Sequence, residues 1–184
     1  VLDLGGDVDP DRLRRAGQAL LDRHRNLRAV FVTDEAGRSL QLVLDEVELP
    51  WQVIEASDLS GRAGESGVPA LLAEEQARRF DMERAPLIRF LLVKSHEDRY
   101  HLAVTAHHIL MDGWSMPLLM QDLMALYVLR GDRAALPPTR SYADFLAWLE
   151  EQDHAASLER WAEAMGGISE PTIVAPVQRD ADND

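Results

Sequence analysis

The sequence predicts a mixed α/β (α+β) fold in two layers, with a largely antiparallel sheet and helices packed on it. Segments rich in β-branched and aromatic residues alternate with segments whose apolar residues recur at helical spacing. Short polar turns join two pairs of predicted strands, which favours hairpins over crossover helices. Residues 87–94 form a nearly unbroken apolar run, typical of a strand buried on both faces. These features disfavour a purely parallel, doubly wound sheet.

The first third of the chain predicts, in order, a strand, a helix, a hairpin and another strand. Residues 1–4 resemble the end of a strand. Asp9 followed by Pro10 is typical of a helix N-cap with proline in the first turn, and leucines at helical spacing continue to about His24. The following predicted segments are a strand at 27–33, a turn at 34–37, a strand at 40–44 and a strand at 51–55.

The rest of the chain predicts a loop, a second hairpin and several helices. Residues 57–67 hold three glycines and three serines, which indicates a loop before a helix at 68–80. Strands at 87–94 and 100–106, with a polar turn between them, predict a hairpin with a loop of four or five residues. Further helices are predicted at 114–129, where Gly131 ends the helix, from Ser141 onward, and at 158–164.

The composition limits the classes of function. The chain has 184 residues, 46% of them hydrophobic, which suits one domain or one large lobe of a two-lobed enzyme. A formal net charge of −13 repels phosphate backbones, so we expect no nucleic-acid partner; the acidity serves solubility or steers a protein partner. The chain has no cysteine, which excludes disulfides and fits a cytoplasmic protein. No apolar run approaches the roughly 20 residues of a membrane helix, so we expect no membrane partner.

The residues that carry chemistry lie between a buried strand and a helix, at 105–115. Alternation along the strand places His107 and His108 on opposite sides, which makes them a poor chelating pair, and we expect no metal site. A histidine at a strand end can act as a general base or orient an amine, and the following helix directs its positive end at the same place. Asp112 can orient the imidazole or pair with an arginine, and Gly113 lets the backbone pass close to a ligand. The alternative is a structural histidine pair without a catalytic role.

Residues 107–113, His-His-Ile-Leu-Met-Asp-Gly, resemble the His-His-x-x-x-Asp-Gly signature of the condensation domains of nonribosomal peptide synthetases. Residues 23–31 resemble the family's Arg-His-Glu-x-Leu-Arg-Thr-x-Phe block, although Arg25 replaces the glutamate and Ala29 the threonine. Residues 81–92 resemble its Pro-Leu-x-Arg strand. The resemblance covers nearly the whole chain in the right order.

The resemblance implies a chloramphenicol-acetyltransferase-like lobe of an amide-forming acyltransferase. In this family two such lobes form a V around a tunnel. Carrier proteins deliver the donor and the acceptor on 4′-phosphopantetheine arms, and the acceptor amine attacks the donor thioester. The partners implied are donor and acceptor carrier proteins, the C-terminal lobe of the same domain and adjacent synthetase domains. No cofactor is expected to bind to this lobe itself.

The resemblance also implies roles for the residues of the signature. His108 becomes the catalytic histidine, as a base or as a positioning group, with Gly113 beside it at the catalytic site. His107 becomes a structural residue of the active site. Residues 112–119 resemble condensation domains that accept a D-configured donor and an L-configured acceptor.

Asp112 maps to a structural aspartate that pairs with an arginine in this family. Arg28 and Arg23 are the candidates for that arginine, and we favour Arg28. Breaking a buried pair of this kind costs about 3–5 kcal/mol, so replacing Asp112 by alanine is expected to damage folding as well as rate.

The resemblance predicts an incomplete enzyme. Residues 1–166 would form the N-terminal lobe, and residues 167–184 a linker toward a C-terminal lobe outside the chain. We expect the isolated lobe to be inactive, because half of the tunnel wall would be missing. Two alternatives remain: a related acyltransferase that forms esters or uses acyl-CoA, and a non-catalytic platform that recruits a partner protein.

Overall fold

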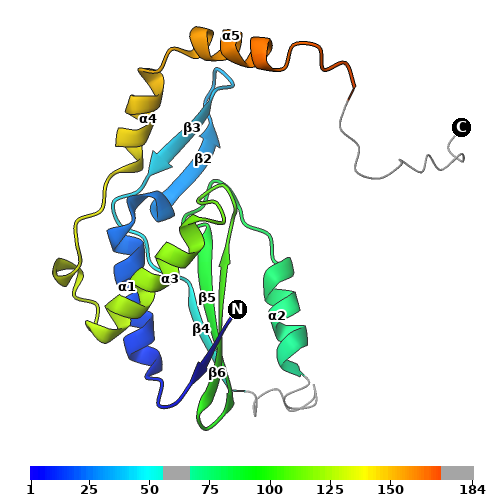
Figure 1. Ribbon diagram of the computed structural model, residues 1–184. Coiled ribbons are helices and arrows are strands. Elements are labelled where there is room, and N and C mark those ends of the chain that lie inside the picture. Colours follow the sequence, from blue (N-terminus) through cyan, green and yellow to red (C-terminus); the bar gives the residue numbers. More distant parts are fainter. Residues whose placement is uncertain (56–66, 171–184) are drawn as a thin grey trace, which may run out of the picture. The chain divides into compact units, whose positions relative to one another are not determined.

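Residues 1–55 and 67–170 are described by the structure, a computed structural model of the chain (Figure 1). They belong to two compact units, Val1–Tyr142 and Ala143–Asp184, which are described one at a time. The loop predicted at 57–67 lies almost entirely outside the described residues, as does most of the linker predicted at 167–184.

The first unit is built on a four-stranded sheet with the strand order β1-β6-β5-β4. β6 is antiparallel to both β1 and β5, whereas β4 runs parallel to β5. The strands are β1 (Leu2–Gly5), β4 (Trp51–Glu55), β5 (Ile88–His96) and β6 (Arg99–Ala106). The prediction of a mixed, largely antiparallel sheet is confirmed.

A separate two-stranded sheet is the first predicted hairpin, in which β2 (Ala29–Thr33) pairs with β3 (Ser39–Val43). Asp34 holds its turn, because its Oδ1 accepts the N–H groups of Ala36 (3.0 Å) and Arg38 (2.8 Å). Gly37 supplies the left-handed backbone that the turn requires, with a φ of 78°. A short 3-10 turn, η1 (Arg25–Arg28), precedes β2.

Helices cover both faces of the four-stranded sheet. In Figure 1, α1 (Pro10–Arg23) and α3 (Ser115–Val128) lie on one side of the strands and α2 (Gly67–Ala77) on the other. Alternation along β5 explains this arrangement, since successive side chains point to opposite faces. Ile88, Phe90 and Leu92 pack in the core under α1 and α3. Leu91 and Val93 pack in a smaller cluster with Val68 of α2.

The ends of α1 and α3 are set by local chemistry. The Asp9 carboxylate accepts the N–H of Arg12 at 2.9 Å, which confirms the predicted N-cap of α1. Beyond α3, both Arg130 (φ 55°) and Gly131 (φ 84°) are left-handed, and the Gly131 N–H donates to the Leu126 carbonyl at 2.8 Å. Both Arg130 and Gly131 therefore adopt the left-handed backbone that ends the helix, whereas the sequence predicted this for Gly131 alone.

Some predicted boundaries are wrong by a few residues. β5 continues to His96, which pairs with Arg99, so only Glu97 and Asp98 connect the second hairpin instead of four or five residues. α2 ends at Ala77 rather than at residue 80. In the second unit, the last helix begins four residues before the predicted 158, because Asp153 caps it by accepting the Ala156 N–H at 2.9 Å.

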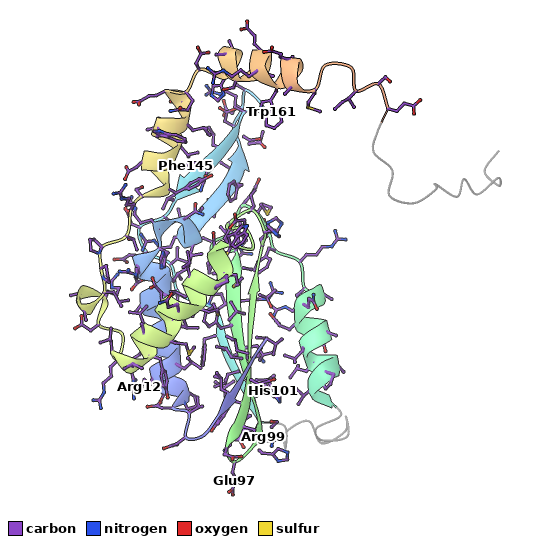
Figure 2. All side chains as sticks on the ribbon, viewed as in Figure 1. Arg12, Glu97, Arg99, His101, Phe145 and Trp161 are labelled. Carbon is purple, nitrogen blue, oxygen red and sulfur yellow. The ribbon has the colours of Figure 1, made fainter. Side chains whose placement is uncertain are left out.

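The described part of the second unit consists of α4 (Tyr142–Glu150), whose first residue still belongs to the first unit, and α5 (His154–Ala164). No described residue from 143 to 170 is buried. Its large apolar side chains are exposed, among them Phe145 and Trp161, which Figure 2 marks on the two helices. Trp148 and Trp161 are likewise exposed, by 54% and 66% of their surfaces.

None of the helices in residues 1–55 and 67–170 is both long enough and apolar enough to span a bilayer.

Candidate functional site

The signature residues 107–113 form the loop between β6 and α3. The His107 N–H donates to the Leu87 carbonyl at 2.9 Å, which adds one more bond to the β5–β6 ladder. The Leu110 N–H then donates back to the His107 carbonyl at 3.1 Å and closes a turn. His108 and Ile109 occupy the middle of this turn, and both are exposed. The strand ends at Ala106, as predicted, so the alternation expected for His107 and His108 does not apply, and the turn rather than the strand presents His108.

His107 is held from two directions. Its Nδ1 accepts the Ile109 N–H at 3.2 Å, so the neutral ring carries its proton on Nε2. The ring stands edge-on to Phe80, with centroids 6.3 Å apart and an interplanar angle of 84°. His107 is half-buried, whereas His108 is exposed.

Phe80 in turn lies under the guanidinium group of Arg89, whose central carbon is 4.2 Å from the ring centroid. Arg89 is buried on β5, and its Nε donates to the Glu75 carboxylate, which is also buried. Its Nη2 donates to the carbonyls of Glu75 (2.6 Å) and Arg78 (2.8 Å), so Arg89 caps the C-terminal end of α2. A second guanidinium, that of Arg78, donates to Glu75 at 2.8 Å.

Glu75 and Arg89 were not among the residues that the sequence pointed to. One signal was present: Arg89 interrupts an otherwise apolar strand, and a buried guanidinium requires an acidic partner. The identity of that partner could not be deduced from spacing, since Glu75 lies on a different element.

The middle of the loop is anchored to the segment after α1. Leu110 is buried, and its carbonyl accepts the Asn26 side-chain amide at 2.6 Å. Asn26 accepts in turn from the Gln41 amide of β3 at 2.7 Å. The turn that carries His108 is therefore fixed on both sides, by His107 before it and by Leu110 after it.

Asp112 does not pair with an arginine in the described part of the chain, and that expectation is wrong. Its Oδ1 accepts the N–H (2.9 Å) and the hydroxyl (2.7 Å) of Ser115, the first residue of α3. The Ser115 hydroxyl and then the Ser115 N–H hold the pKa of the Asp112 carboxyl below its ordinary value. Because Asp112 is exposed, the cost expected for breaking a buried ion pair does not apply to it.

The two candidate arginines have other partners, because packing brings them to other groups. Arg28 is buried and donates to the carbonyls of Leu44 (3.0 Å) and Asp22 (2.9 Å), which ties η1 to its neighbours. Arg23 donates to the carboxylate of Asp122 on α3 at 2.8 Å. Neither arginine reaches Asp112 in the described structure.

Arg23, His24 and Asp122 form a polar cluster at the junction of α1 and α3. Asp122 Oδ2 lies 2.8 Å from both Arg23 Nε and His24 Nε2. Burial raises the pKa of the Asp122 carboxyl, but the hydrogen bonds from Arg23 and His24 lower it by more, so it lies below its ordinary value. This cluster supports the packing of the two helices.

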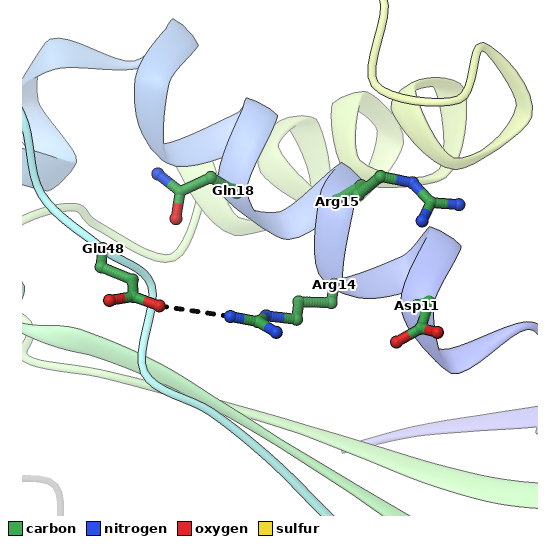
Figure 3. A pocket seen from close by; sticks show the side chains of 5 residues that line it. All are labelled: Asp11, Arg14, Arg15, Gln18 and Glu48. Atoms are coloured by element: carbon green, nitrogen blue, oxygen red, sulfur yellow. Dashed lines mark hydrogen bonds and ion pairs between the residues drawn. The ribbon is translucent and has the colours of Figure 1, made fainter.

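A surface hollow on α1 lies apart from the signature loop and contains none of the predicted site residues. Asp11, Arg14, Arg15, Gln18 and Glu48 line it (Figure 3). Arg14 Nη2 and Glu48 Oε1 form an exposed ion pair across it at 3.2 Å. Within the described residues, no group of three or more His, Asp or Glu side chains is arranged to hold a metal ion.

Known proteins resemble this chain over nearly its whole length. The family model of the condensation domain matches residues 1–184. Chondramide synthase cmdD of Chondromyces crocatus is 36% identical over 175 residues, which cover 94% of this chain and 4% of that protein. Surfactin synthase subunit 3 of Bacillus subtilis (strain 168) is 30% identical over 172 residues, which cover 92% of this chain and 14% of that protein. The chain thus spans a small fraction of these relatives.

Solved structures agree on the fold. SgcC5 from Streptomyces globisporus has 28% identity and a TM-score of 0.73, over 90% of this chain and 38% of that one. The X-domain from teicoplanin biosynthesis, solved in a complex with OxyB, has 29% identity and a TM-score of 0.73, over 96% of this chain and 39% of that one. A mutant of the starter condensation domain of rhizomide synthetase RzmA has a TM-score of 0.81 at 20% identity, over 95% of this chain and 41% of that one, and supports the fold alone.

The fold inferred from the signature, a chloramphenicol-acetyltransferase-like lobe, is confirmed by these neighbours. Together with the match of the family model over residues 1–184, the loop geometry leads to one conclusion: the chain belongs to the condensation-domain family.

Proposed function

We propose that this chain is the N-terminal lobe of a nonribosomal peptide synthetase condensation domain, which joins a donor acyl or peptidyl thioester to an acceptor aminoacyl thioester. The observation that carries the proposal is the exposed imidazole of His108, in a turn anchored by His107 on one side and Leu110 on the other. The relatives named as chondramide and surfactin synthases support this class of function.

For this reaction the lobe has to hold the two thioesters in place and assist the removal of one proton from the acceptor amine. The acceptor nitrogen attacks the donor thioester carbon, the C–N bond forms, and the C–S bond breaks to release the donor thiol. His108 either takes the proton that the amine loses or hydrogen-bonds the amine in the attacking geometry. Holding two tethered reactants in line contributes several kcal/mol through orientation alone, by order of magnitude. Gly113 precedes α3 at the same site and keeps the backbone free of a side chain there.

Exposed apolar side chains near His108 in the sequence support a missing cover over the site. Ile109 is 45% exposed, Trp114 88% and Leu118 66%, and exposed apolar surface of this kind is typical of a site that another protein surface covers. We propose that the second lobe of the domain covers them, and that the isolated chain is inactive for that reason. Residues 1–166 would be the lobe, and residues 167–184 would lead to its partner.

The finer parts of the proposal concern partners and stereochemistry. The 4′-phosphopantetheine groups would arrive on donor and acceptor carrier proteins, and the lobe itself would bind no cofactor. A D-configured donor and an L-configured acceptor are proposed from residues 112–119. Asp112 would act by securing the start of α3 through Ser115 rather than through an arginine.

The test is condensation by a complete two-lobe domain that contains this chain, with separately loaded donor and acceptor carriers. His108→Ala is expected to lower the rate about 100-fold or more with the melting temperature unchanged. His101→Ala is the matched control and should retain the rate. His101 lies on β6, and its Nδ1 is 2.6 Å from the carboxylate oxygen Oδ1 of Asp3. A wild-type rate for His108→Ala would refute the assignment.

The substrates then separate the alternatives. D- and L-aminoacyl donors compared side by side test the stereochemical proposal. Turnover with acyl-CoA or an alcohol, and none with loaded carriers, would favour the related acyltransferase. The X-domain was solved in a complex with OxyB, so a platform that recruits a partner protein is a second candidate; the presence of His108, Asp112 and Gly113 argues against it.

A further inference from the structure

The signature loop is connected to the interior on the α2 face of the sheet by a series of side-chain contacts. His107 makes an edge-to-face contact with Phe80, Phe80 lies under Arg89, and Arg89 is fixed by Glu75. His107 also accepts the N–H of Ile109, the residue directly after His108. The contacts therefore run without interruption from a buried ion pair to the turn that carries His108.

We propose that Phe80 and Arg89 are positioning residues, which set the orientation and tautomer of His107 and through it the turn that carries His108. The proposal deepens the proposed function and rests on it for its catalytic meaning. Its structural content, the tautomer of His107 and the protection of the Ile109 N–H, can be measured without any turnover.

The geometry shows how each link restricts the next. The Arg89 guanidinium makes hydrogen bonds to the Glu75 carboxylate and to the carbonyls of Glu75 and Arg78, so its plane has little freedom. The Phe80 ring packs with one face toward this plane, at 4.2 Å from the guanidinium carbon. The positive charge favours this placement, because a ring face is electron-rich.

His107 is then left with one favoured ring orientation. The interplanar angle of 84° makes this an edge-to-face contact with Phe80, an arrangement that aromatic rings prefer over stacking face to face. In this orientation Nδ1 accepts the Ile109 N–H at 3.2 Å, and a rotation of the ring would break that bond. The bond requires an unprotonated Nδ1, so ring orientation, tautomer and turn geometry are coupled.

The primary test uses imidazole nitrogen spectra and amide exchange of the 184-residue chain. Phe80→Leu keeps an apolar side chain but removes the ring. We expect the wild type to show His107 as a single tautomer, with the proton on Nε2, and Phe80→Leu to show a mixture of tautomers. Exchange of the Ile109 N–H should become about fivefold faster, as for the loss of one ordinary hydrogen bond. Exchange in the core, for example at Leu92, should not change, which separates local from global opening.

Two further variants make the result specific. Phe80→Tyr keeps the ring and should restore the single tautomer. Tyr127→Leu removes a different ring that also lies beside a guanidinium, with the Arg12 carbon 4.6 Å from its centroid, and should leave His107 unchanged. A folded Phe80→Leu chain with the wild-type tautomer and wild-type Ile109 exchange would overturn the proposal. If Phe80→Leu does not fold, Arg89→Lys, which keeps the charge but loses the planar fork, is measured instead under the same criteria.

The catalytic arm uses the complete two-lobe domain. Phe80→Leu should lower kcat with KM nearly unchanged, and should have no further effect when His108 is already alanine. If His108→Ala proves active, the proposed function fails, but the imidazole nitrogen spectra still show whether Phe80 sets the tautomer of His107. If His108→Ala is inactive and the spectra of Phe80→Leu match the wild type, the positioning proposal alone fails.

Discussion

The two faces of the four-stranded sheet are stabilised in different ways. Under α1 and α3 lies an extensive apolar core, with contributions from both helices and from β5 and β6. On the α2 face the apolar cluster is small, and a buried ion pair between Glu75 and Arg89 lies beside it. Burial of apolar area is non-directional, whereas an ion pair and its hydrogen bonds specify one geometry. The first face therefore contributes mostly stability, and the second holds the position of His107.

The sharpest way to break this difference is to remove Arg89. Arg89→Met leaves the buried Glu75 carboxylate with only the exposed guanidinium of Arg78 as an ion-pair partner, so we expect a loss of about 3 kcal/mol in the free energy of unfolding, at the low end for a broken buried pair. Urea denaturation with a constant m-value measures it. The double variant Glu75→Leu/Arg89→Met is the control, because it removes both charges and should lose much less. Equal losses in the two variants would show that the charge pair is not the cause.

On the opposite face, the matching change is Leu123→Ala. Leu123 is fully buried in α3, and its truncation leaves a cavity that costs about 2–5 kcal/mol. Leu123→Ala should lower the melting temperature without changing the tautomer of His107 in the imidazole nitrogen spectra. Changes on the α2 face, such as Phe80→Leu, should change that tautomer. Leu118→Ala, on the exposed side of the same helix, serves as its control and should change stability little. A tautomer change in Leu123→Ala would remove the proposed distinction between the faces.

At the rim of the apolar face, Asp122→Asn tests the polar cluster with Arg23 and His24. We expect a loss of about 1 kcal/mol near pH 7, since the cluster is partly solvated. The pKa of Asp122 is depressed in the folded chain from its ordinary value of 3.8, so its contribution is present above that pH. The stability difference between variant and wild type should therefore be constant down to about pH 5 and shrink as the pH falls through the folded pKa. A difference that grows on acidification would contradict the assignment.

The smallest expected effect belongs to Asp112→Ala. Asp112 is exposed and accepts the N–H and the hydroxyl of Ser115 at the start of α3, so its loss resembles the removal of a helix cap, with a Tm decrease of about 2 °C. Asp112→Asn keeps an acceptor for the Ser115 N–H and should restore most of the loss. A collapse of the fold in Asp112→Ala would instead show that the residue has a buried partner in the complete domain.

Whether a structural feature could be predicted from the sequence depends on how far apart in the sequence its interacting residues lie. Asp9 as the N-cap of α1, Asp34 in its turn and the hairpin of β2 and β3 are contacts between residues close in the sequence, and the sequence predicts them well. The predicted end of β6 at residue 106 is correct, but the alternation expected for His107 and His108 does not apply, because β5 starts at Ile88 opposite Ala106 and the ladder of β6 stops there. His108 was expected at the end of the strand and lies in the turn that follows it.

The sequence by itself determined the order and type of the elements, the two faces of β5 and the place of the signature loop between strand and helix. These follow from periodicity and capping, which are local properties of the chain. Only the tertiary structure decided the partners of the charged groups: Glu75 for Arg89, Asp122 for Arg23, backbone carbonyls for Arg28, and Ser115 for Asp112. The physical reason is that most of these contacts join different elements, and the packing register that brings such side chains together leaves no spacing pattern in the sequence. Asp112 had two kinds of possible partner, the nearby Ser115 and the more distant Arg23 or Arg28. The tertiary structure shows that its partner is Ser115.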